Sequence, residues 1–161
     1  MYCSSHLEDV VFNLYKSLNI KHPNELNLRL ITKRLKMKMF YYDDSTAILY
    51  KYGRFHVFIN ENIPIFEQWP EFSHELGHSI VNYGDQWYMP FPYRRLQEWQ
   101  ANNFAYHFCV PTFMLRELKE TSIQSISETF NVDYAFASKR LEMYQNKFMY
   151  ERVPENAGSY H

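Results

Sequence analysis

The chain has 161 residues, of which 46% are hydrophobic and 22% are charged, a composition typical of one globular domain. A chain of this length buries about 70% of the surface that its unfolded form exposes, so it can form a core without disulfide bonds. Its 17 basic and 18 acidic residues give a net charge of -1, which argues against nucleic-acid binding, because that function needs a clustered basic excess.

Two features of the sequence indicate a cytoplasmic protein. Cys3 and Cys109 are too few for a disulfide scaffold and fit a reducing compartment. The N-terminal sequence MYCSSHLEDV carries acidic residues where a signal peptide has a basic and then an apolar stretch. No apolar run approaches the roughly 18 residues of a membrane span, so we expect no contact with a membrane.

The first part of the chain predicts two helices followed by a small sheet. Apolar residues recur at steps of three and four from Leu7 to Leu18, and a second helix is expected from Leu26 to Leu35. Three β-prone runs follow between Met37 and Asn60, separated by Asp43-Asp44-Ser45 and by Gly53-Arg54. We expect them to form a three-stranded antiparallel sheet.

Helical spacing returns after Asn60. An apolar stripe predicts a helix that starts or kinks at Pro70 and stops at Gly84. The residues of this stripe are Trp69, Phe72, Leu76, Ile80 and Tyr83. The segment from Gly84 to Tyr93 contains two prolines and has no period, which predicts a surface loop, and a further helix is expected from about Arg94 to Cys109.

The remainder of the chain predicts a helical tail. Helices are expected at Phe113–Lys119, Ile123–Phe130 and Tyr134–Tyr144, and the last residues are expected to be frayed. No internal repeat or linker divides the sequence. The elements therefore predict an α+β fold in a single domain over residues 1–161, with a core over 1–110, a tail over 111–150 and a frayed end over 151–161.

A motif with metal-binding spacing lies in the helix around Pro70. His74-Glu75-Leu76-Gly77-His78 matches the pattern H-E-x-x-H. The two histidines are one helical turn apart, so both rings can bind one ion at about 2.0–2.1 Å. Glu75 is placed to act as a general base on a metal-bound water. The motif predicts one zinc ion per chain, although two histidines and a carboxylate also suit iron or manganese.

A third ligand is expected from the helix that begins near Arg94. Glu98 shares one stripe with Ala101 and Ala105, whose small side chains let this helix approach the first one closely. Asn102 lies one turn beyond Glu98. We expect it to hydrogen-bond the outer nitrogen of one histidine ring and to fix its tautomer.

Spacing alone leaves other assignments open. Glu71 or Asp85 is an alternative carboxylate ligand in a different geometry. Cys109 cannot bind the same ion as Glu98, because the 11 residues between these positions correspond to about 16 Å of continuous helix. Four residues are candidates for stabilising the oxyanion, and spacing does not rank them: His56, Tyr83, Tyr88 and Tyr93.

Two motifs resemble those of the ImmA/IrrE-type metallopeptidases, a family found in bacteria and often in phages and other mobile elements. FSHELGHSIVN, residues 72–82, is similar to the active-site helix of that family. EWQANNFAYHFCVP, residues 98–111, is similar to its pattern E-x-x-A-N-x-F-A followed by proline. The resemblance implies a zincin-like core in which His74, His78 and Glu98 bind zinc and Glu75 is the catalytic base.

The same resemblance implies a partner, because members of the family cut or antagonise helix-turn-helix repressors of phages and mobile elements. The tail from Ile126 to Leu141 also resembles the helix-turn-helix spacing that often follows the peptidase core, with departures at Ser127 and Asp133. Packing of one helix pair accounts for its apolar positions without DNA. We therefore expect no direct nucleic-acid binding.

The leading hypothesis is a cytoplasmic zinc endopeptidase of restricted specificity that acts on a protein substrate. The strand from Arg54 to Asn60 is expected to hold an extended substrate by strand addition. The alternative is a non-proteolytic regulator that binds a repressor and uses zinc to hold its helices together. A third hypothesis is a phage-encoded or toxin–antitoxin interaction module. The oligomeric state, the cleaved bond and the activating signal stay open.

Overall fold

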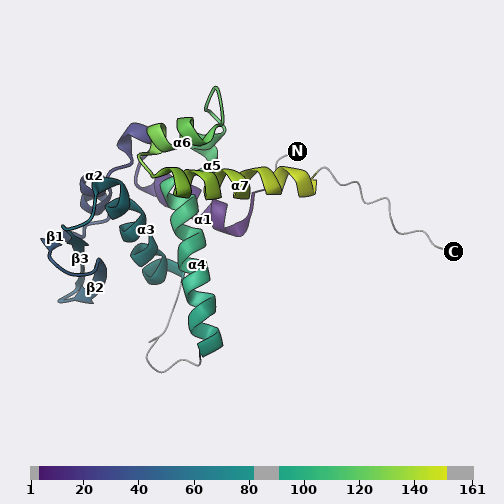
Figure 1. Ribbon diagram of the computed structural model, residues 1–161. Coiled ribbons are helices and arrows are strands. Elements are labelled where there is room, and N and C mark those ends of the chain that lie inside the picture. Colours follow the sequence, from purple (N-terminus) through teal and green to yellow (C-terminus); the bar gives the residue numbers. More distant parts are fainter. Residues whose placement is uncertain (1–3, 82–90, 152–161) are drawn as a thin grey trace.

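The structure is a computed structural model that describes residues 4–81 and 91–151, with one small sheet at the side of a group of helices (Figure 1). Its elements in chain order are α1 (His6–Ser17), the 3-10 helix η1 (Pro23–Glu25), α2 (Leu28–Arg34), β1 (Lys38–Tyr42), β2 (Ala47–Lys51), β3 (Arg54–Asn60), α3 (Ile65–Val81), α4 (Phe91–Cys109), α5 (Thr112–Leu115), α6 (Ile123–Phe130) and α7 (Tyr134–Glu151). The sheet contacts α3, α3 packs along α4, and α4 contacts α7. This arrangement confirms the expected α+β class.

The two predicted N-terminal helices are present as α1 and α2. Ser5 caps α1, since its hydroxyl accepts a hydrogen bond from the Glu8 N–H while the Glu8 carboxylate accepts one from the Ser5 N–H. α2 begins later than expected because Pro23–Glu25 form a separate 3-10 turn and the Asn27 side chain caps the helix at the Leu30 N–H, 2.9 Å away.

The sheet has three strands as predicted, but it is mixed rather than antiparallel. The strand order is β1-β3-β2, with β1 parallel and β2 antiparallel to β3. Only β2 and β3 form a hairpin, whose turn has positive φ at Tyr52 (53°) and Gly53 (75°). The connection from β1 to β2 instead passes the end of β3, where the Asn60 N–H donates to the Thr46 hydroxyl and the Asn62 amide donates to the Asp43 carbonyl.

α3 begins at Ile65, so of the two alternatives predicted at Pro70, a helix start and a kink, the start is wrong. Pro70 lies inside the second turn, where its missing N–H removes one helical bond, to the carbonyl of Phe66. The Pro64 carbonyl accepts hydrogen bonds from the Glu67 and Gln68 N–H groups, so the helix is already established before the proline. The predicted stop at Gly84 and the predicted surface loop lie outside the described residues, apart from Phe91–Tyr93, which belong to α4.

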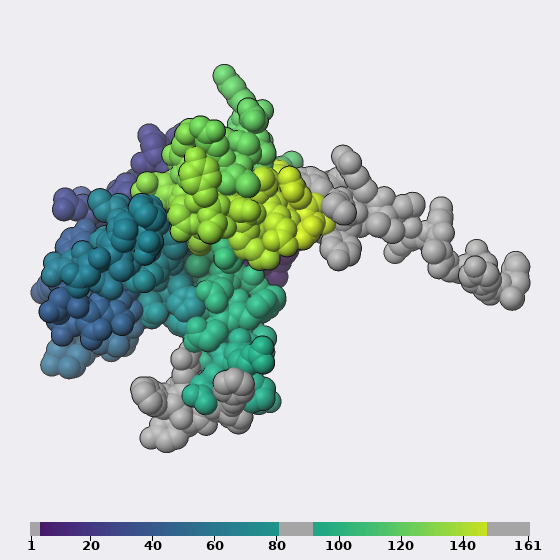
Figure 2. All heavy atoms as spheres, in the orientation of Figure 1, coloured from purple at the N-terminus to yellow at the C-terminus, as the bar shows by residue number. Residues whose placement is uncertain are grey.

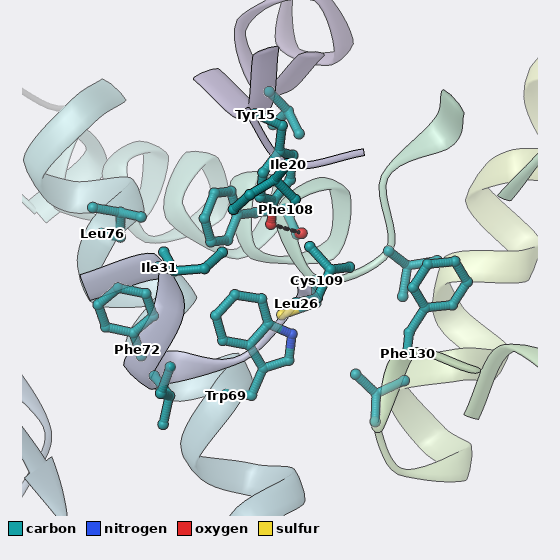
Figure 3. Close-up of a cluster of buried hydrophobic side chains, with 14 of the residues drawn as sticks. Tyr15, Ile20, Leu26, Ile31, Trp69, Phe72, Leu76, Phe108, Cys109 and Phe130 are labelled. Atoms are coloured by element: carbon teal, nitrogen blue, oxygen red, sulfur yellow. Dashed lines mark hydrogen bonds between the residues drawn. The ribbon is translucent and has the colours of Figure 1, made fainter. Parts of the chain in front are cut away.

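The predicted apolar stripe of α3 forms part of the core (Figure 3). Trp69, Phe72 and Leu76 are buried in one cluster with Phe108 of α4. The Phe108 ring lies 5.4 Å from Trp69, and Tyr15 of α1 stacks on it at 4.7 Å between centroids. The Tyr15 hydroxyl donates to the Phe108 carbonyl at 2.6 Å, which satisfies a buried polar group. The stripe also includes Ile80, which is partly buried, and Tyr83, which lies outside the described residues.

Cys109 is a buried free thiol rather than part of a disulfide. Its Sγ donates to the Ser73 hydroxyl at 3.1 Å, and Ser73 donates to the Trp69 carbonyl at 2.8 Å. Burial raises the pKa of the thiol, so it stays protonated. Cys3 lies outside the described residues.

The tail differs from its prediction at both ends. α5 ends at Leu115 rather than Lys119, and α7 continues to Glu151. Asn131, at φ 53°, ends α6 in the left-handed conformation, and Asp133 accepts a hydrogen bond from the Phe136 N–H at the start of α7. The unusual Asp133 of the helix-turn-helix resemblance therefore has a capping role.

A buried polar network joins the tail to α1. Arg140, only 1% exposed, donates to the Val110 carbonyl at 3.1 Å and to the Thr112 hydroxyl at 2.7 Å. Thr112 donates to the Glu8 carboxylate at 2.7 Å, and Lys147 pairs with the same carboxylate.

Within the described ranges, no helix combines the length and apolar character needed to cross a bilayer.

Candidate metal centre

The candidate site lies where α3 and α4 approach each other closely. A Cβ built on Gly77 would lie 3.1 Å from the Cα and the carbonyl oxygen of Ala101 and 3.1 Å from the Phe104 ring. Ala101 and Ala105 are buried at this contact, in agreement with the role predicted for them. The sequence pattern did not predict that Gly77 lies at this contact. Its position inside a predicted helix was the available signal, because a glycine there lowers helix stability and usually marks a packing requirement.

Three side chains converge at this contact. His74 and His78 lie one turn apart on α3, and their Nε2 atoms are 3.0 Å apart. The Glu98 carboxylate of α4 reaches both rings, with Oε2 3.3 Å from His74 Nε2 and Oε1 3.4 Å from His78 Nε2. Among the described residues, this is the group whose His, Cys, Asp or Glu ligand atoms lie close enough together to hold one ion.

The spacing of these donor atoms fits a tetrahedral metal ion. Two ligands bound at 2.0–2.1 Å to a tetrahedral ion are separated by about 3.3–3.4 Å. The observed separations of 3.0, 3.3 and 3.4 Å lie close to this value. Two imidazoles and one carboxylate also match the donor set of catalytic zinc sites, which keep a fourth position for water.

The surroundings of the two histidines also suit metal binding. The Asn102 side-chain oxygen lies 3.0 Å from His74 Nδ1 and can accept a hydrogen bond from it, which leaves Nε2 of that ring to face the cluster. This is the hydrogen bond that the sequence predicted for Asn102. Burial, and then the neighbouring His74, lower the pKa of His78 below its usual value, which favours the neutral ring.

Glu75 lies beside the histidines and lines the same cavity as His74. Its pKa is raised above the usual value, chiefly because the carboxyl is partly buried. His74 opposes this shift, whereas Glu98 and Glu71 add to it. A carboxyl group with a raised pKa can exchange a proton more readily near neutral pH, as a general base requires.

The cavity beside the site has a volume of about 440 Å³. Its walls come from the sheet end, α3, α4 and α7, and its described lining residues are Ser45, Thr46, Asn60, Pro70, Glu71, His74, Glu75, Asn102, Ala105, Tyr106 and Phe136. Tyr106 and Phe136 pack together with ring centroids 4.5 Å apart. The tail therefore supplies part of the cavity wall, which the sequence did not indicate.

The alternative residues fall in different places. Glu71 lines the cavity but does not belong to the three-residue cluster, and Asp85 lies outside the described residues. Of the oxyanion candidates, Tyr83 and Tyr88 are likewise outside. Tyr93 is 62% exposed on α4, and His56 stacks on Phe40 at 6.3 Å; in the described part of the chain neither residue lines the cavity.

The expectation that β3 receives the substrate as an added strand is wrong. β3 is the central strand, and its middle residues pair with β1 on one side and β2 on the other. Its backbone groups are therefore already used in the sheet. β2 is an edge strand, and Ser45 and Thr46, which directly precede it, line the cavity, so β2 offers a backbone edge that begins beside the candidate site.

Comparisons with known proteins agree with this architecture. A sequence model for peptidases, described as the IrrE N-terminal-like domain, matches residues 25–142. The phage-like element PBSX protein XkdA of Bacillus subtilis (strain 168) is 38% identical over 149 residues, which cover 89% of this chain and 75% of that protein. The uncharacterized protein YqaB of the same organism is 35% identical over 151 residues, which cover 91% of this chain and 88% of that protein.

A solved structure is also similar in fold. It is a Mycobacterium tuberculosis transcriptional regulator, with a TM-score of 0.55 and 17% sequence identity. The match covers 84% of this chain and 47% of the regulator, so the chain spans about half of that protein's length. At this identity, the likeness concerns the fold alone.

Proposed function

Because this chain belongs to the peptidase family of IrrE N-terminal-like domains, we propose that it is a zinc-dependent endopeptidase of restricted specificity. The observation that carries the proposal is the convergence of His74, His78 and Glu98 at tetrahedral spacing, with Glu75 beside them on the wall of a cavity. The zincin-like arrangement and the identity of the metal are parts of the same proposal.

His74, His78 and Glu98 would hold one zinc ion through two imidazole nitrogens and one carboxylate. When bound, zinc lowers the pKa of a water molecule to about 7 and polarises a peptide carbonyl. Asn102 keeps the His74 ring in the orientation that points Nε2 at the cluster. Iron and manganese use similar donor sets, so elemental analysis decides between the metals.

Glu75 is the general base in this proposal. Its carboxylate takes a proton from the attacking water and then delivers it to the leaving amine. In this proposal the substrate peptide lies in the cavity, whose described lining includes three residues with hydroxyl donors, Ser45, Thr46 and Tyr106. Burial raises the pKa of Tyr106, so its hydroxyl keeps its proton and can donate.

The proposed substrate is a helix-turn-helix repressor of a phage or mobile element. The family resemblance supports this target, and the matching XkdA protein is named as part of a phage-like element. In this proposal the tail packs against the core and does not bind nucleic acid. Restricted specificity would protect the other proteins of the cytoplasm, where we propose that the chain acts.

The experiment that tests the proposal compares the wild type with Glu75→Gln. Each purified chain is loaded with zinc and incubated with the repressor of its own mobile element, and the products are identified by mass spectrometry. The proposal predicts that the variant keeps zinc and fold but yields no cleavage products. If Glu75→Gln relieves repression in cells as well as the wild type does, the non-proteolytic zinc-stabilised regulator is the correct alternative.

A further inference from the structure

The charges of the sheet are separated between its two ends. β1 and β3 begin, and β2 ends, at the end of the sheet away from the cavity. This end carries the exposed basic residues Lys36, Lys38, Lys51 and Arg54. Neither residues 35–42 nor residues 47–60 contain an acidic side chain. The acidic Asp43, Asp44 and Glu61 all follow the opposite end, next to the cavity.

A second cavity lies at the basic end, remote from the candidate metal centre. It has a volume of about 450 Å³ and lies between the α2–β1 connection and the β2–β3 hairpin. Its described lining residues are Leu35, Lys36, Tyr50, Gly53, Arg54 and Phe55. Tyr50 and Phe55 are 66% and 37% exposed, with ring centroids 4.9 Å apart, so the cavity combines an open aromatic wall with two cations.

The hairpin holds this cavity in a defined shape. The register places Tyr50 opposite Phe55 and Lys51 opposite Arg54. The two-residue turn at Tyr52 and Gly53 fixes that register, because its positive φ angles match the twist of the paired strands. The backbone positions of the aromatic wall and of Arg54 are therefore fixed side by side before a ligand binds.

The basic residues at this end have no acidic partner within the described parts of the chain. In residues 4–81 and 91–151, none of the four forms an ion pair with a carboxylate. Lys38 instead lies over the Phe40 ring at 5.2 Å, and Lys51 lies over the Tyr52 ring at 5.3 Å. In Figure 2 the sheet, in blue, forms one edge of the molecular surface. These cations are accessible to a ligand.

We propose that this cavity and the four basic residues around it, the basic sheet end, bind an acidic segment of a partner protein that also carries an aromatic or large aliphatic side chain. The apolar side chain would pack on Tyr50 and Phe55, and carboxylates beside it would pair with Lys36 and Arg54. The Arg54 guanidinium suits a carboxylate, because its donors match both oxygens.

Nucleic acid fits this surface less well. Nucleic-acid binding gains affinity from a series of phosphates neutralised by basic residues. Here the basic residues cover one end of a sheet only, and Asp43, Asp44 and Glu61 would repel a backbone that continued along the strands. The whole chain has a net charge of -1. A short acidic peptide meets the basic end without reaching the acidic one.

The basic sheet end also has a favourable position relative to the metal centre. Thr46, which lines the first cavity, directly precedes β2, and the extended chain from Thr46 to Lys51 at the basic end spans about 17 Å at 3.3–3.4 Å per residue. A protein bound in the first cavity could contact the basic sheet end with a segment several residues away. Such a contact would add specificity for a peptidase or for a non-proteolytic binder, so the inference does not rest on catalysis.

Selection from a random dodecamer peptide library displayed on phage tests the inference. The bait is the full chain, and selection on the wild type is compared with selection on Lys36→Glu/Arg54→Glu. We expect the wild type to enrich peptides with acidic residues next to an aromatic or aliphatic one, and the double variant to lose them. A matched control, Lys119→Glu, reverses an exposed charge outside the basic sheet end and should enrich the same peptides.

A synthetic copy of the most enriched peptide then gives the affinity by fluorescence anisotropy. We expect binding at least tenfold weaker for the double variant and weaker at high salt, with little change for Lys119→Glu. Tyr50→Ala removes only one exposed ring of the aromatic wall and should also weaken peptide binding. It replaces the double variant in this test if the double variant folds poorly. Thermal unfolding of each variant checks the fold.

Three results would overturn the inference. The selection could enrich no acidic peptides, or the enriched peptides could bind the double variant as tightly as the wild type. A single-stranded oligonucleotide of about 16 nucleotides, the upper end of the range that one small binding domain covers, is measured in parallel. If it binds through Lys36 and Arg54 while acidic peptides do not, the basic sheet end is a nucleic-acid site instead.

Discussion

Replacing Gly77 with alanine tests the close approach of α3 and α4, on which the spacing of the proposed metal ligands depends. The added Cβ would lie 3.1 Å from the Cα and the carbonyl oxygen of Ala101, where ordinary contacts begin at 3.4 Å. The helices must therefore separate by a few tenths of an ångström. Overpacking of this kind costs about 1–3 kcal/mol, whereas replacing a helical glycine with alanine gains about 0.5–1 kcal/mol.

With the middle of each range, the net effect of Gly77→Ala is a loss of roughly 1 kcal/mol, or about 2–4 °C in Tm for a chain of this size. Because Glu98 lies one turn from Ala101 on α4, the same displacement moves one ligand away from His74 and His78. We expect zinc to bind about tenfold more weakly, which is the lower end of the loss in metal affinity caused by removing a residue that orients a metal ligand.

The assay is thermal unfolding with EDTA and with zinc, followed by a competition titration for zinc affinity. Ser79→Ala, on the same helix, serves as the control and should not lower Tm. Ala101→Gly should not rescue Gly77→Ala, because the atoms that the new Cβ meets on Ala101 are its Cα and carbonyl oxygen. A Gly77→Ala variant as stable as the wild type, with unchanged zinc affinity, would refute the packing argument.

Three further predictions follow from other contacts. Asn102→Ala removes the hydrogen bond to His74 and should weaken zinc binding about 10–100-fold in a chelator competition. Arg140→Met deletes the buried guanidinium that joins Val110 and Thr112, and should lower the free energy of unfolding in urea by about 3 kcal/mol; a change below 1 kcal/mol would contradict its role. Burial and then Arg140 lower the pKa of His107 to about 3, so it stays neutral when folded but binds a proton when unfolded below pH 6.5. Stability should therefore fall by about 2 kcal/mol between pH 8 and 5 through this residue, and His107→Gln should show a correspondingly shallower pH dependence.

The convergence of His74, His78 and Glu98 at the candidate metal centre could be predicted from the sequence because the spacing of these residues is local. H-E-x-x-H places two histidines one turn apart on any helix, and Glu98 precedes the small residue Ala101 by one turn on another. What pattern analysis did not supply was the reason that the helices meet. Gly77 was treated as an unspecified position of the motif, yet its missing side chain sets the distance between the two backbones.

Long-range features were less accessible to sequence reasoning. Three β-prone runs do not say which strand is central, and the order β1-β3-β2 depends on the connection at Asp43–Thr46 and its bonds to Asn60 and Asn62. The error about substrate binding to β3 follows from this. The packing of Phe136 against Tyr106 likewise joins elements that are distant in the sequence, so spacing could not place the tail at the cavity.

The metal content of the purified full chain tests the central claim most directly. The wild type and His78→Ala are desalted and analysed for zinc, iron and manganese, with circular dichroism to confirm that both are folded. The account predicts one zinc ion per wild-type chain and its loss from the variant, because the cluster would keep only His74 and Glu98. A folded wild type without tightly bound metal, or a variant that retains the ion, would contradict it.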